Sequence, residues 1–109
     1  MSSLLLKIEN ETSNSITGIT KIEFFDQNPN TNEKKLLKII DCSPAITLAA
    51  QSSSEPCTVK GFNIYDYSGE KIYFFNCTIT LSDTSTKSGS GGGPVSYMRE
   101  HQPYSLPIY

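Results

Sequence analysis

The stretch that decides the fold reads TVKGFNIYDYSGEKIYFFNCTITLS and covers Thr58–Ser82. β-branched and aromatic residues dominate it, and these residue types favour strands. Ser68-Gly69 divides the stretch near its middle, and a Ser-Gly pair is typical of a turn. We therefore predict a hairpin of two antiparallel strands, Thr58–Tyr67 and Lys71–Ser82.

The alternation of residue types in this hairpin predicts its register. Phe62 should face Phe75 and Ile64 should face Tyr73, because a slip of one residue would exchange the two faces of the hairpin. The predicted core face carries Phe62, Ile64, Tyr73, Phe75, Cys77, Ile79 and Leu81. The predicted outer face carries Asn63, Tyr65, Tyr67, Glu70, Ile72, Phe74, Asn76 and Thr78.

The remaining chain up to residue 83 also has the pattern of short strands. Leu4–Glu9 alternates, and Ile16–Asp26 and Lys34–Cys42 flank an Asn-rich loop, which predicts a second hairpin. Ser43-Pro44 should end that hairpin, and Ala45–Ala50 should form a further short strand. With 109 residues and no helical periodicity, the chain is expected to be all-β. We predict a small single-domain antiparallel β-sandwich, immunoglobulin-like or jelly-roll-like, of about six to eight strands.

The composition changes after this region and divides the chain into three parts. Residues 1–83 form the predicted sandwich, and residues 84–93 form a Ser/Gly-rich hinge or linker, which is either natural or engineered. Residues 94–109 form an extended Pro/Tyr-rich arm, whose three prolines argue against a continuous helix and against a central strand.

The arm is unusually rich in large side chains for the end of a chain. This composition is typical of a peptide that docks in a groove or beside a sheet edge. The arm would dock on its own sandwich or on a neighbouring one, although it can also be the last strand of the domain or an unrelated exposed end. The predicted partner-docking residues are Val95, Tyr97, Met98, Tyr104, Leu106, Ile108 and Tyr109.

The charge pattern disfavours several classes of partner. The formal net charge is −2, and no run of basic residues is longer than Lys34-Lys35, so no nucleic-acid partner is expected. No segment has the length of a transmembrane helix, and the apolar run Leu4–Leu6 is too short for a signal peptide. We expect a cytoplasmic location, although export without a signal peptide or incorporation into an extracellular assembly is compatible with the sequence.

Residues for catalysis or metal binding are sparse. His101 is the only histidine, and Cys42, Cys57 and Cys77 form no C-x-x-C pair. The loop from Asp26 to Glu33 begins like a calcium-binding loop but lacks the required glycine. We therefore expect no enzyme activity, no metal and no cofactor.

Two functions remain after these exclusions. The first is a structural or interaction protein that self-assembles into a homo-oligomer or filament. The alternative is a lectin-like β-sandwich, which includes proteins of a toxin type, that binds carbohydrate or another ligand through stacking and amide groups. The residues predicted for that ligand site are Asn63, Tyr65, Tyr67, Phe74 and Asn76.

Overall fold

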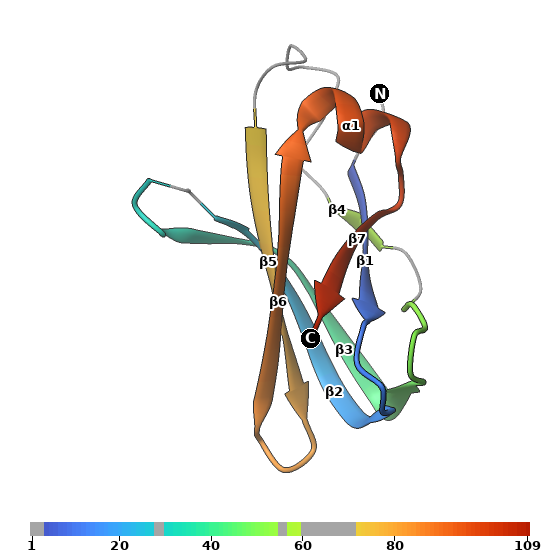
Figure 1. Cartoon of the computed structure of the whole chain (residues 1–109). Helices are drawn as coiled ribbons and strands as arrows, with labels where there is room; N and C mark the ends of the chain where they lie inside the picture. The colour runs from blue at the N-terminus through green and yellow to red at the C-terminus, as the bar shows by residue number, and fades with distance from the viewer. Residues whose placement is uncertain (1–3, 28–29, 55–56, 60–71) are drawn as a thin grey trace.

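The computed structural model of the chain describes residues 4–27, 30–54, 57–59 and 72–109. Within them the fold is all-β, with a single mixed sheet and one six-residue helix (Figure 1). The strand order in the sheet is β3-β2-β5-β6-β7-β1-β4. The elements are β1 (Leu4–Asn10), β2 (Ile16–Gln27), β3 (Lys34–Leu48), β4 (Cys57–Val59), β5 (Ile72–Leu81), β6 (Thr86–Pro94), α1 (Val95–Glu100) and β7 (Tyr104–Ile108).

The sheet curls into a half-barrel (Figure 1). The hydrophobic core lies on its concave side. Alternate residues of the strands point inward, as the period of two in a strand requires. Within the described residues, no helix is long and apolar enough to cross a membrane. The buried core residues are Leu6, Ile8, Ile16, Ile19, Ile22, Phe24, Leu48, Phe75, Cys77, Ile79, Met98, Leu106 and Ile108.

The predicted hairpin around the Asn-rich loop is confirmed by the pairing of β2 with β3. Ile22 and Phe24 are buried, as alternation predicted. The strand β3 does not end at Ser43-Pro44, however, but continues to Leu48. The ladder to β2 is interrupted there by register shifts, and β3 is the end strand of the sheet, so the missing N–H of Pro44 is tolerated.

The predicted hairpin of Thr58–Tyr67 with Lys71–Ser82 is wrong in its pairing. β4, which covers the start of the first predicted strand, pairs with β1 instead. Both edges of β5 are already occupied, by β2 on one side and by β6 on the other. Phe75 therefore lies between Asp26 and Gly91, whereas residues 60–71, with Phe62, Ile64, Tyr65 and Asp66, lie outside the described residues.

The faces predicted for the second half of that hairpin are nevertheless confirmed. Phe75, Cys77 and Ile79 are buried, and Phe74 is exposed on the other face. The two-layer sandwich is not confirmed, because the strands join one sheet rather than two. The sheet is also not purely antiparallel, since β7 runs parallel to β1 from Leu6↔Tyr104 to Asn10↔Ile108.

The Ser/Gly-rich segment expected to form a hinge at 84–93 differs most from its prediction. Residues 86–94 form β6, which pairs with β5 over nine residues from Ile72↔Pro94 to Thr80↔Thr86. The strand is paired because its backbone completes the ladder of β5, which requires no side chains. Gly89, Gly91 and Gly93 recur every second residue and so share one face of the sheet, toward which β7 packs.

Strand β7 approaches β6 so closely that only glycine fits at their contact. A Cβ atom on Gly89 would collide with the carbonyl oxygen of Pro107 and lie 2.9 Å from Cδ1 of Ile108. A Cβ atom on Gly91 would lie 3.0 Å from Cδ2 of Leu106. The hydroxyl of Tyr104 donates a hydrogen bond of 2.7 Å to the carbonyl of Gly92. The glycine face of β6 therefore provides the space in which β7 lies.

This contact predicts a graded response to alanine along β6. Gly89→Ala should lower the free energy of unfolding by about 3 kcal/mol or more, because the obstacle is backbone and cannot rotate away. Gly91→Ala should cost roughly 1 kcal/mol, because the side chain of Leu106 can shift. Gly93→Ala is the matched control, since its Cβ would meet only the Tyr104 hydroxyl at 3.9 Å. Urea unfolding measures all three, and equal losses at the three positions would contradict the close approach.

A buried asparagine ties the end of β1 to the end of β3. Asn10 is fully buried, and its Nδ2 lies 2.9, 3.1 and 3.2 Å from the carbonyl oxygens of Asn14, Leu48 and Ala49. Its Oδ1 accepts hydrogen bonds from the backbone N–H and the hydroxyl of Thr12. The one side chain therefore satisfies polar groups from two segments, the turn after β1 and the end of β3, as a buried amide must.

Replacement of Asn10 by alanine should destabilise the fold strongly. We expect Asn10→Ala to lower the free energy of unfolding by about 2–4 kcal/mol, because buried carbonyls of the β3 end lose their donor. Asn14→Ala is the matched control, because Asn14 is exposed and accepts the hydrogen bond through its backbone oxygen. Denaturant unfolding of both variants checks this, and similar stabilities for the two would refute the role of Asn10.

Candidate interaction surface

The predicted docking residues of segment 94–109 separate into buried and exposed groups. Met98, Leu106 and Ile108 are completely buried in the core, and Tyr104 is half-buried against it. Tyr97 and Tyr109 are 49% and 83% exposed. Val95 begins α1, but its side chain lies outside the described part. Most of the described large side chains of this segment therefore contact the sheet of their own chain.

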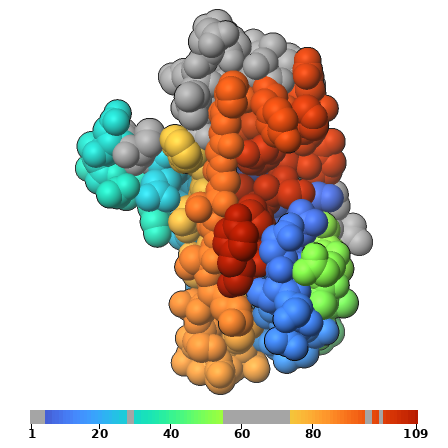
Figure 2. All heavy atoms as spheres, in the orientation of Figure 1, coloured from blue at the N-terminus to red at the C-terminus, as the bar shows by residue number. Residues whose placement is uncertain are grey.

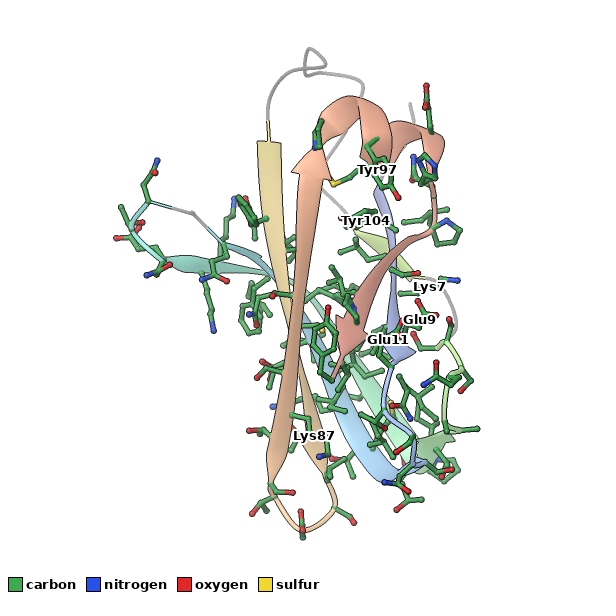
Figure 3. The ribbon with its side chains drawn as sticks, viewed as in Figure 1. Lys7, Glu9, Glu11, Lys87, Tyr97 and Tyr104 are labelled. Atoms are coloured by element: carbon green, nitrogen blue, oxygen red, sulfur yellow. The ribbon has the colours of Figure 1, made fainter. Side chains whose placement is uncertain are left out.

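Tyr97, His101 and Tyr104 form an aromatic group between α1 and β7 (Figure 3). The rings of Tyr97 and His101 stack at 4.0 Å between centroids, and Tyr104 meets Tyr97 edge-on at 6.2 Å. Burial, together with the neighbouring Tyr97, raises the pKa of Tyr104. His101 Nδ1 lies 2.9 Å from the carbonyl oxygen of Tyr97, so this ring is engaged within its own segment. These contacts stabilise the turn that leads from β6 into β7.

Two of the residues predicted for a ligand site lie close together on the outer face of β5. Phe74 is 41% exposed, and Asn76 is half-buried two residues further on. Asn76 Nδ2 donates to Gln27 Oε1 at 3.5 Å, whereas its Oδ1 is buried and has no hydrogen-bond partner in the part of the chain that the structure describes. The other three predicted residues, Asn63, Tyr65 and Tyr67, lie outside the described residues.

The outer face next to Phe74 carries further apolar side chains that the sequence-based prediction missed. Cross-strand partners share a face, and Phe25 of β2 pairs with Leu36 of β3, as Glu23 pairs with Ile39. Leu36 and Ile39 are 46% and 44% exposed. We call Phe25, Leu36, Ile39 and Phe74 the outer patch. Exposed large apolar side chains that gather on one face typically mark an interaction site.

The outer patch was difficult to find in the sequence because a β-bulge interrupts the alternation of β3. The register shifts between Phe24 and Phe25, so that Leu37 becomes an extra residue on β3. Leu36 and Ile39 then share the outer face although they are three residues apart. A strict period of two would have placed them on opposite faces.

The outer patch lies at an end of the sheet that no strand of the described residues covers. Among the described residues, no strand pairs with the second edge of β3, which is the first strand in the sheet order. Figure 2 shows the tip of the β2–β3 hairpin standing out from the body of the molecule. Lys34 Nζ lies 6.0 Å from the centroid of the Phe25 ring, so a positive charge borders the patch. An open sheet edge beside an apolar patch is suited to pairing with another chain.

The ionisable groups of the described residues are spread along the chain. No group of three or more His, Cys, Asp or Glu within them could hold a metal ion. Cys77 is fully buried, and desolvation raises the pKa of its thiol to about 12. Burial and the nearby Asp41 also raise the pKa of Cys42. Both thiols are therefore protonated near neutral pH, as structural cysteines are.

Comparisons of the chain with protein-family models, with curated proteins and with solved structures gave no match.

Proposed function

We propose that this protein is a non-catalytic structural or interaction module that self-associates into a homo-oligomer, with residues 94–109 docked on the sheet of their own chain. The observation that carries the proposal is the outer patch beside the edge of β3 with which no described strand pairs. Burial of Leu36, Ile39 and Phe74 against a second molecule would remove apolar surface from water, which drives most protein association.

The position of segment 94–109 supports the choice of β3 as the contact. Three of its large side chains are already buried in their own core, so they are not available to a neighbour while β7 is in place. Leu36 and Ile39 of β3, in contrast, remain exposed. Docking of the segment in another copy would require the parallel ladder of β1 with β7 to open.

The proposal predicts that disruption of the outer patch produces monomers. The full chain should scatter light as an oligomer after size exclusion over a concentration series. Leu36→Glu combined with Ile39→Glu should reduce its mass to that of one chain, because it places charges in the apolar contact. Thr78→Glu combined with Ser88→Glu is the matched control, since these residues pair across β5 and β6 on the same face but outside the patch. A full chain that is monomeric at every concentration would refute the proposal.

A carbohydrate-binding function is the second candidate, and one observation favours it. The exposed ring of Phe74 offers a surface on which a sugar ring would stack, and it lies on the same strand face as the half-buried Asn76. A glycan array with the wild type and Phe74→Ala distinguishes the two functions, since only a lectin-like module would bind a glycan and lose it in the variant.

A further inference from the structure

The outward-facing residues of β3 form a self-complementary pattern along the strand. Cross-strand pairing with β2 places Lys34, Leu36, Ile39 and Asp41 on the outer face, opposite Gln27, Phe25, Glu23 and Lys21. The chemical order is therefore basic, apolar, apolar, acidic. The bulge at Leu37 makes the intervals between these four residues symmetrical, with two, three and two positions.

From this pattern we infer that two copies of the chain pair antiparallel along their β3 edges about a two-fold axis. The inference rests on the proposed self-association and specifies its interface. In this arrangement Lys34 faces the partner's Asp41, and Leu36 faces the partner's Ile39. Each contact occurs twice, as an isologous interface requires. Opposite-charge pairs and apolar pairs directly across two strands are the contacts that stabilise a sheet.

The inward-facing residues agree with the same register. Lys35 and Lys38 lie on the face of Asp26 and Phe24, and they would oppose the partner's Ile40 and the partner's Leu37. No two lysines then face each other. If the pairing between the two β3 strands slipped by one residue in either direction, outward-facing residues of one copy would oppose inward-facing residues of the other. The reason is that the side chains of β3 alternate between the two faces except at the single bulge. The pattern is therefore specific for one register.

The lysines, the bulge and the proline of β3 are features that normally protect an edge strand from pairing, and here they restrict which strand can pair with it. Lysines, bulges and prolines discourage unspecific pairing of exposed edges. On β3, Pro44 lies beyond Asp41 and so outside the segment that would pair. Lys34 penalises a strand that lacks a carboxylate at the matching position, whereas a second copy supplies one in Asp41. A second copy is thus the occupant that fits this edge best.

Charge reversal tests the pairing, because Lys34 and Asp41 are both exposed and can be changed without disturbing the core. Lys34→Asp or Asp41→Lys alone creates two like-charge contacts in the dimer. Each should weaken the dimerisation Kd by roughly tenfold or more. The double variant Lys34→Asp/Asp41→Lys restores both contacts and should dimerise like the wild type. An equimolar mixture of the two single variants should form heterodimers, whereas each variant alone dissociates.

Analytical ultracentrifugation at low salt measures these equilibria, and thermal unfolding confirms that each variant is folded. Weakening in both single variants, with rescue in the double variant and in the mixture, supports the antiparallel β3 pair. A chain that self-associates equally well in all variants overturns this interface but leaves the proposed self-association standing. A wild type that is monomeric throughout overturns both. Recovery of a different protein strand bound at the β3 edge, with no dimer, also overturns the inference.

Discussion

The close approach of β7 to the glycine face of β6 is the contact on which the rest of the structure depends. Gly89 lies directly against the backbone of Pro107, and a Cβ atom at this position would collide with the Pro107 carbonyl oxygen. β7 can therefore lie beside β1 and bury Leu106 and Ile108 over the core. Without that strand, the concave side of the half-barrel would lose two of its fully buried side chains. The glycines of β6 are therefore required for the close packing of β7.

The arrangement also determines which part of the sheet remains accessible. One end of the sheet is formed by β1 and β4. Residues 52–54 also contact β1 there, through the hydrogen bond from the Ser54 N–H to the Ile8 carbonyl and through the Glu9↔Ser53 bridge. The other end is β3, whose outer face carries Leu36 and Ile39. The two ends of the sheet therefore differ, and only one combines an unpaired long strand with exposed apolar side chains within the described residues. This asymmetry connects the fold to the proposed association.

Much of the fold could be predicted from alternation, whereas the pairing of distant strands could not. The faces of β2 and β5 followed from residues such as Ile22 and Cys77, because burial of one face leaves a period of two in the sequence. The position of β6 was missed because Ser-Gly repeats resemble a flexible linker in composition. The recurrence of glycine at 89, 91 and 93 was the available signal, since it marks one face of a strand. The outer patch was missed because the bulge at Leu37 displaces the alternation, which is a property of the paired strands rather than of one segment.

The contact between β6 and β7 can be measured directly by nuclear Overhauser effects in solution. In a mixture of isotope-labelled and unlabelled chains, the account predicts strong effects between the Gly89 α-protons and the Ile108 δ-methyl group. These effects should arise within one chain, because the segment docks on its own sheet. Their absence would contradict the glycine contact, and their appearance only between labelled and unlabelled chains would show that β7 is supplied by a neighbour.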